Sequence, residues 1–217
     1  TLIRENVAAN FYASPAGHFA YWYDYDQKQY FTFNTATGKI KNISSGVGYP
    51  LYDTENDVPD LPSPMGNIGW IENDESFLVR DMYDIWRLDP KGIEVPVCIS
   101  NGYGRKNSIR FSYVNTDIEK RYFNKNEEII LKGFNRQTKH SGLFFKSPDL
   151  QGDPQEKIMG AFGIADLEKS RDSNTYLIQK TDIKSSELFL TSNLDSLIKL
   201  TNVSEQQDAY NWMTVSL

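Results

Sequence analysis

The stretch Tyr83-Asp84-Ile85-Trp86-Arg87-Leu88-Asp89-Pro90-Lys91-Gly92 decides the fold of this 217-residue chain. Its first half predicts a strand, and alternation places Ile85 on one face and Trp86 and Leu88 on the other. Asp89 to Gly92 fits a tight turn, with Asp first, Pro second and Gly last. A second apolar run follows at Val97 to Ser100, so the unit is a hairpin. Because both faces of its first strand carry large apolar groups, that strand needs cover on both sides.

Similar units recur along the chain. Four groups of short strands separated by turn residues are expected at residues 7–44, 68–100, 109–159 and 161–201. The equivalent second strands begin near Phe19, Phe77, Ile129 and Tyr176, a spacing on the order of 45 to 60 residues that is typical of propeller blades. The innermost strand of the fourth unit has the weakest pattern.

A sheet with two apolar faces cannot bury both by itself, so neighbouring units must stack face to face. We therefore predict a single all-β region over residues 1–217, a β-propeller of about four blades of four antiparallel strands that forms part of a larger propeller. A two-sheet sandwich with irregular loops is the structural alternative.

Composition excludes several classes of function. The chain has 23 Lys and Arg against 29 Asp and Glu, a net charge of -6 and a pI near 5.0, which argues against a nucleic-acid partner. No run of 18 or more apolar residues is present, so no membrane span is expected. Thr1 and the strand-like residues at the end predict a piece of a longer chain. The single cysteine, Cys98, is expected to be a small buried core residue.

Residues 45–66 form the least strand-like segment, rich in proline and acid. Four carboxylates there suggest calcium ligands, but the ordered calcium-loop pattern with its central glycine is missing. A connecting loop held against the sheet by Pro50-Leu51-Tyr52 is the favoured interpretation, although loops of this length often cover functional sites.

The common catalytic motifs are absent. There is no Gly-x-Ser-x-Gly elbow, and the commonest zinc and nucleotide-phosphate signatures are also missing. The two histidines, His18 and His140, are expected to be structural or solvated. Glu127-Glu128 could anchor a peptide amine, but adjacent strand residues point to opposite faces, so an ordinary strand entry is favoured. We predict no catalytic, cofactor or metal residue in this chain, and the sequence assigns no substrate-binding residue.

Several stretches resemble the β-propeller domain of the prolyl oligopeptidase family, the dipeptidyl-peptidase-IV-like serine peptidases, in their Bacteroidetes-type members. The matching segments are Ser14 to Tyr21, Asn34 to Lys39, Asp81 to Gly92 and Tyr210 to Met213. The Ser-Pro-x-Gly turn is shared by many propellers, whereas Tyr-Asp-Ile-Trp-x-Leu-Asp-Pro-x-Gly is more specific.

The resemblance implies a non-catalytic domain that gates the access of short peptides to a serine peptidase site outside this chain. The partner would be a C-terminal α/β-hydrolase domain, with residues 202–217 starting the linker and loop 45–66 as the candidate contact. No catalytic residue is carried over, because none of the matching segments belongs to the catalytic motif. The family likeness also favours a periplasmic or extracellular location.

A free-standing TolB-like propeller that acts as a protein-interaction scaffold is the alternative function. Four blades in an open array would leave two blade faces exposed. We therefore expect either self-association of two copies into a larger ring or, less favoured, closure as a four-bladed propeller.

Overall fold

The protein is built from four four-stranded antiparallel sheets. A computed structural model describes residues 7–183, 185–203, 205 and 210. The first sheet contains β1 (Phe11–Ala13), β2 (Phe19–Asp24), β3 (Gln29–Asn34) and β4 (Ile40–Asn42), and the second β5 (Asn67–Trp70), β6 (Phe77–Arg80), β7 (Ile85–Leu88) and β8 (Val97–Cys98). The third contains β9 (Ile109–Tyr113), β10 (Ile129–Asn135), β11 (Ser141–Lys146) and β12 (Gln155–Gly160), and the fourth β13 (Gly163–Lys169), β14 (Tyr176–Thr181), β15 (Ser186–Thr191) and β16 (Ile198–Lys199).

The repeat read from the sequence matches the strands. Phe19, Phe77, Ile129 and Tyr176 are each the first residue of the second strand of a sheet. All four are buried, because the strand that starts there runs through the middle of its sheet. The all-β prediction of propeller blades, each of four antiparallel strands, is confirmed.

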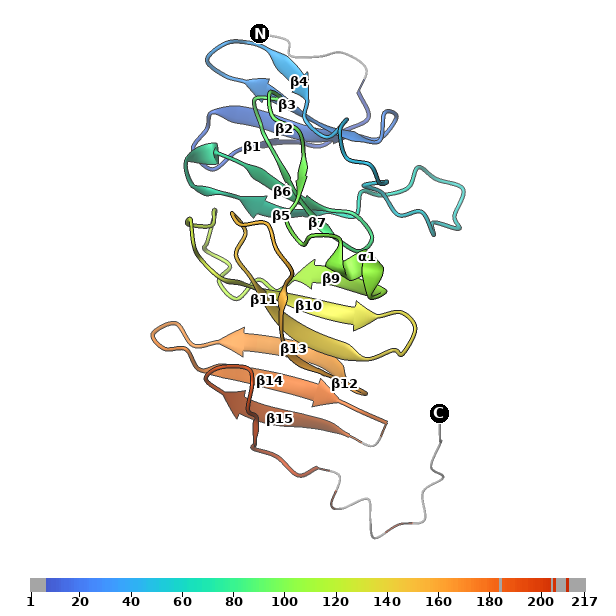
Figure 1. Cartoon of the computed structure of the whole chain (residues 1–217), viewed down its shortest axis with the longest axis vertical. Coiled ribbons are helices and arrows are strands. Elements are labelled where there is room, and N and C mark those ends of the chain that lie inside the picture. The colour runs from blue at the N-terminus through green and yellow to red at the C-terminus, as the bar shows by residue number, and fades with distance from the viewer. Residues whose placement is uncertain (1–6, 184, 204, 206–209, 211–217) are drawn as a thin grey trace.

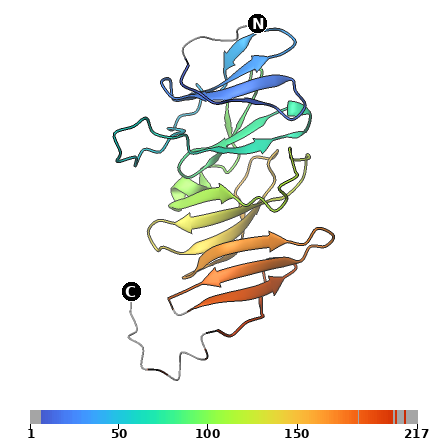
Figure 2. The same ribbon diagram turned by 180° about the vertical axis from the view of Figure 1, so that it is seen from behind.

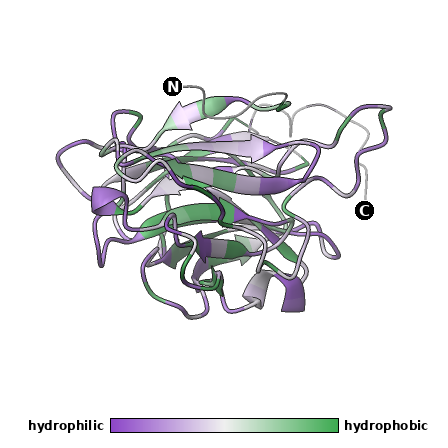
Figure 3. Ribbon diagram, turned by 90° about the horizontal axis from the view of Figure 1, so that it is seen from above, coloured by the Kyte–Doolittle hydropathy of each residue, from purple (hydrophilic) through white to green (hydrophobic). Residues whose placement is uncertain are grey.

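The sheets stack face to face in a row (Figure 1, Figure 2). The first lies at one end of the long axis and the fourth at the other, so the four sheets form an open row. The less favoured alternative, closure as a four-bladed propeller, is therefore wrong. Three buried apolar clusters join the first sheet to the second, the second to the third, and the third to the fourth. Seen along the stack, hydrophobic residues concentrate in the strands and hydrophilic residues in the peripheral loops (Figure 3).

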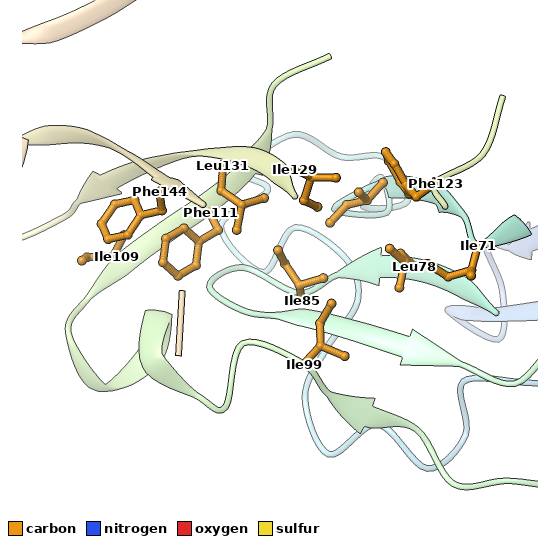
Figure 4. Close-up of a cluster of buried hydrophobic side chains, with 11 residues drawn as sticks. Ile71, Leu78, Ile85, Ile99, Ile109, Phe111, Phe123, Ile129, Leu131 and Phe144 are labelled. Carbon is orange, nitrogen blue, oxygen red and sulfur yellow. The ribbon is translucent and has the colours of Figure 1, made fainter. Parts of the chain in front are cut away.

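The strand within Tyr83 to Gly92 is covered on both sides, as predicted. Ile85 packs with Phe111 and Leu131 of the third sheet (Figure 4). Trp86 and Leu88, on the opposite face of β7, pack in the cluster shared with the first sheet. The strand is shorter than expected, because the residues just before Ile85 form a turn instead of extending the strand.

The turn after β7 has the predicted chemistry. The Asp89 carboxylate accepts hydrogen bonds from the backbone N–H groups of Lys91 (2.8 Å) and Ile93 (2.8 Å). The carbonyl of Pro90 accepts one from the Thr32 hydroxyl of the first sheet at 2.7 Å. The turn therefore closes the hairpin and ties it to the neighbouring blade.

A short helix, α1 (Tyr103–Lys106), lies between β8 and β9. Its backbone N–H groups at Gly104 and Arg105 donate to the buried Asp84 carboxylate at 2.9 and 3.1 Å. Burial raises the pKa of Asp84 above its ordinary value. Gly104 packs so tightly that a Cβ there would lie 2.7 Å from the carbonyl oxygen of Ile109 and closer still to that of Tyr83. Asp84 and Gly104 together fix this connection between the second and third sheets.

Loop 45–66 is held against the sheets as interpreted. Leu51 is buried in the cluster between the first and second sheets, and Tyr52 forms a β-bridge with Pro64. Glu55 forms ion pairs with Arg136 (2.5 Å) and Arg110 (3.7 Å) of the third sheet. The loop projects beside the stack (Figure 1), and its contact with a hydrolase domain stays a prediction.

Two further expectations, the burial of Cys98 and the linker at residues 202–217, can be compared with the structure. Cys98 is half-buried instead of buried, because β8 is a two-residue strand at the sheet edge. Its thiol accepts a hydrogen bond from the Gly102 N–H at 3.3 Å, and burial raises its pKa. Of the expected linker 202–217, only residues 202, 203, 205 and 210 lie within the described part of the chain.

Candidate ligand-binding cleft

A cleft of about 980 Å³ opens between the third and fourth sheets. The third sheet contributes the end of β9, the loop residues 115–120, the start of β10, and single residues of β11 and β12. The fourth sheet contributes β13, the β13–β14 turn, the first residue of β14 and the loop after β15. Its volume lies within the range of about 300–1,000 Å³ that is usual for ligand sites.

The floor of the cleft is apolar. Ile130, Leu167 and Tyr176 line it and belong to the buried cluster between the two sheets, against which Phe145 also packs. These side chains come from the inward faces of β10, β11, β13 and β14. The cleft therefore offers an apolar surface beneath a polar rim.

The rim carries both signs of charge. Its acidic residues are Asp117, Glu119, Glu127, Glu128, Asp166 and Glu168, and its basic residues are Lys120, Lys157, Lys169 and Arg171. Arg171 of the fourth sheet approaches Glu119 of the third at 3.7 Å, but both side chains are about four-fifths exposed, so this pair contributes little free energy. Lys157 lies 5.0 Å from the ring centroid of Phe145.

Two tyrosines at the cleft have raised pKa values. Burial, with Glu127 and Asp117 nearby, raises the pKa of Tyr113 to about 12. Burial and the charge of Glu128 raise the pKa of Tyr176. Both phenols are therefore neutral at physiological pH. Tyr113 packs against Phe123, and Tyr176 packs in the buried cluster between the third and fourth sheets.

Glu127 and Glu128 both line the cleft, in different roles. Glu127 forms an ion pair with Lys120 and accepts a hydrogen bond from the Asn124 N–H at 3.0 Å. Within the described part of the chain, the Glu128 carboxylate has no hydrogen bond or ion pair and stands near Tyr176. β10 starts at Ile129, so the pair does occupy a strand entry as expected, and Glu128 is an available anion in the cleft.

His18 takes part in a contact between the first two sheets. Asp74 is the last residue of the short 3₁₀ helix η1 (Glu72–Asp74), which connects β5 and β6 of the second sheet. It accepts hydrogen bonds from the Ser14 hydroxyl (2.5 Å), the Ala16 N–H (3.0 Å) and the His18 N–H (3.1 Å). The His18 ring nitrogen Nδ1 also lies 3.5 Å from Asp74. Serine, histidine and aspartate meet here, but the serine donates directly to the aspartate and not to the imidazole. This inter-sheet contact holds the Ser-Pro-Ala-Gly turn in place.

His140 lies in the turn before β11, away from the cleft, and its backbone N–H donates to the Thr138 hydroxyl. Among the described residues no group of three or more His, Cys, Asp or Glu side chains is placed to hold a metal ion. In the same part of the chain, no helix has the length and apolar character needed to cross a membrane.

Sequence reasoning missed most of the cleft. Its walls come from the charged segment 115–120 and the turn 170–174, which are brought together only by the stacking of two sheets. The available signal was the unusual length of the charged segment between β9 and β10. Long loops in a compact domain are frequent sites of function.

Comparison with known proteins gives remote structural similarity. No family model matches the sequence, and no curated protein matches it. An oligogalacturonate lyase solved in complex with manganese is 10% identical with a TM-score of 0.41, over 92% of this chain and 66% of the lyase. The acylaminoacyl peptidase of Pyrococcus horikoshii is 14% identical with a TM-score of 0.32, over 89% of this chain and 39% of the peptidase. The chain thus spans just under two thirds of the first protein and well under half of the second.

Proposed function

We propose that this chain is a non-catalytic β-propeller region that binds short peptides in the cleft between its third and fourth sheets. In this proposal the propeller gates the access of peptides to a serine peptidase site in an α/β-hydrolase domain outside the chain. The observation that carries the proposal is the cleft itself, with its apolar floor and its rim of both charges. The likeness of Asp81 to Gly92 to peptidase propellers supports the assignment to prolyl oligopeptidases of the dipeptidyl-peptidase-IV-like, Bacteroidetes type.

A short peptide suits the cleft in size and charge. Its terminal amine and carboxylate are complementary to the acidic and basic residues of the rim, and its apolar side chains can cover Phe145 and Tyr176. Glu128 is the favoured partner for the amine, because no described residue neutralises its carboxylate. Lys157 is the favoured partner for the carboxylate, since its side chain is mostly buried at the cleft wall. Its present partner is the half-exposed Asp195, at 3.4 Å, and the peptide carboxylate would replace or share that ion pair.

Binding without cleavage fits the residues present. Ser170 and Ser192 line the cleft, whose lining contains no histidine. Among the described residues, neither serine hydroxyl is hydrogen-bonded to a lysine or a carboxylate that could act as the base. Nucleophilic attack by serine needs a base within hydrogen-bonding reach. The chemistry is therefore assigned to the separate hydrolase domain.

Titration calorimetry with an apolar tripeptide tests the proposal. With both termini free, the peptide should bind the wild-type chain, and acetylation of its amine should weaken binding. Glu128→Gln should weaken binding of the free peptide about three- to fivefold, as expected for one partly exposed charge pair. Glu94→Gln, an exposed change on the second sheet, is the matched control and should have no effect. Equal affinity of all three proteins would refute the role of Glu128, and no binding to the wild-type chain would refute the proposal.

The scaffold alternative is favoured by the outward face of the fourth sheet. Tyr176 and Ile178 point into the buried cluster, so their neighbour Leu177 faces outward, and strand pairing places Leu190 and Ile198 beside it. The first sheet presents Phe11 at the other end of the stack, 46% exposed. Head-to-tail stacking of a second copy would extend the three interfaces already present.

Light scattering tests this alternative directly. Self-association should rise with concentration and be weakened by Leu190→Glu, while Leu150→Glu, an exposed leucine in the β11–β12 loop, should leave it unchanged. A monomer at every concentration would refute self-association. The sequence of the encoding gene separates the two functions, because a Gly-x-Ser-x-Gly region after Leu217 favours the peptidase.

A further inference from the structure

A second, smaller pocket of about 110 Å³ lies between the first and second sheets, far from the cleft. Its walls are mostly tyrosine, and the five are Tyr12, Tyr21, Tyr23, Tyr25 and Tyr30. A cavity of about 150 Å³ binds benzene in another protein, so this pocket has room for a head group somewhat smaller than benzene. Neither the sequence motifs nor the proposed function accounts for five tyrosines at one small pocket.

The ring of Tyr23 meets two neighbouring rings at steep angles, and a third pair of rings in the pocket is only tilted. Tyr23 lies 5.0 Å from Tyr30 at an interplanar angle of 63°, and 5.4 Å from Tyr25 at 88°. Tyr12 and Tyr21 lie 5.5 Å apart at 31°. Rings that meet nearly at right angles form adjacent walls of a box, the arrangement by which aromatic cages surround a cation with several π faces.

Tyr23 provides a second, independent observation that points to a ligand. The residue is only 6% exposed, and its hydroxyl is buried without a hydrogen-bond partner among the described residues. A buried polar group without a partner is costly, so such groups usually have a partner that completes them. Burial raises the pKa of Tyr23, so the phenol is neutral and its oxygen can accept a hydrogen bond.

The lining of the pocket carries no formal charge. Neither a basic nor an acidic residue lines it, and its other lining residues are asparagine, proline and glycine, so the tyrosine rings are the groups that would attract a cation. The adjoining Tyr52 already carries a cation, since the Lys28 ammonium lies 4.4 Å from its ring centroid. Tyrosine faces in this part of the molecule therefore already serve as cation-binding surfaces.

We propose that the tyrosine pocket binds a methylated ammonium group that retains one N–H. The methyl groups would lie against the rings, and the N–H would donate to the Tyr23 oxygen. This site is independent of the peptide cleft, and its failure would leave the proposed function standing.

N,N-dimethylethanolamine, an ammonium ion at neutral pH, and isoamyl alcohol, its uncharged isostere, form a matched pair of probes. Titration followed by NMR should show saturable upfield shifts of the N-methyl protons from the ring currents. The ammonium ion should bind at least about fivefold more tightly than the alcohol, the gain expected from one cation–π contact. Equal affinity of the two probes, or no saturable binding of the ammonium ion, would overturn the proposal.

Substitution of single tyrosines tests whether the ammonium ion binds in the tyrosine pocket. Tyr25→Leu should weaken binding of the ammonium ion about fivefold, whereas Tyr25→Phe should stay within about twofold because it keeps the ring. Tyr12→Leu, at a residue 53% exposed, repeats the test at a position tolerant of substitution. The control is Tyr122→Leu, an exposed tyrosine in the β9–β10 loop. Unchanged affinity in both pocket leucine variants, with their circular dichroism preserved, would place binding elsewhere and refute the assignment.

Discussion

Replacement of Asp74 by alanine should destabilise the protein strongly, although the residue lies in a turn. Its buried carboxylate, 3% exposed, holds three donors of the first sheet: the Ser14 hydroxyl, the Ala16 N–H and the His18 N–H. Asp74 also has a positive φ of 56°, next to Asn73 at 59°. The side chain therefore supports a strained turn and an inter-sheet contact at once.

The magnitude follows from these groups. The Ser14 bond is buried, and loss of its acceptor costs about 1–2 kcal/mol. The two backbone bonds are part-buried, so each costs about 1 kcal/mol at most. Alanine in the left-handed region adds about 1 kcal/mol. Together these effects predict a loss of about 2–5 kcal/mol for Asp74→Ala, and a smaller loss for Asp74→Asn, which keeps one oxygen and tolerates the backbone.

Urea unfolding monitored by circular dichroism measures these differences. Asp57→Ala is the control, since Asp57 is exposed in loop 45–66 and should change the unfolding free energy by less than about 0.5 kcal/mol. The reasoning is refuted if Asp74→Ala and Asp57→Ala unfold at the same urea concentration with the same slope.

Two further perturbations follow from the structure. Gly104→Ala should destabilise the chain by about 2–3 kcal/mol, because the new Cβ would meet two backbone carbonyls that cannot move independently; an unchanged melting temperature would contradict that packing. Tyr113 has a pKa of about 12 in the folded protein against about 10 when unfolded, so the stability it contributes is complete below about pH 10 and is lost as the pH rises to about 12. Tyr113→Phe should reduce the loss of unfolding free energy between about pH 9 and about pH 11, and an unchanged loss would show that Tyr113 titrates normally.

The fold could be predicted because its main signal is local and repeated. Because the apolar residues Ile85 and Trp86 lie on opposite faces of one strand, both faces of that strand had to be covered by neighbouring sheets. The four equivalent strand starts predicted which parts of the chain form those sheets. The turn at Asp89 was also predictable, since its hydrogen bonds stay within a few residues. The open arrangement followed from the expectation that the region is part of a larger propeller, but the angles between neighbouring sheets were not predictable from the strand pattern.

The candidate sites depend on contacts between residues that are far apart in the sequence. The alternation of apolar and polar residues along a strand does not predict such contacts. Asp74 is separated from Ser14 by 60 positions, and nothing in the sequence near the Ser-Pro-Ala-Gly turn identifies its partner. Glu128 was interpreted as a strand entry, which is correct, but the facing wall of the cleft belongs to another sheet. The half-buried state of Cys98 reflects the shortness of β8, and strand length is poorly specified by a short apolar run.

Equilibrium dialysis of the purified chain against an apolar tripeptide, followed by mass spectrometry of both compartments, measures peptide binding and peptide cleavage in one sample. We expect an excess of intact tripeptide on the protein side, reduced by Glu128→Gln and by added salt. Cleaved peptide above a protein-free blank would contradict the non-catalytic assignment, and equal peptide on both sides would contradict the binding cleft.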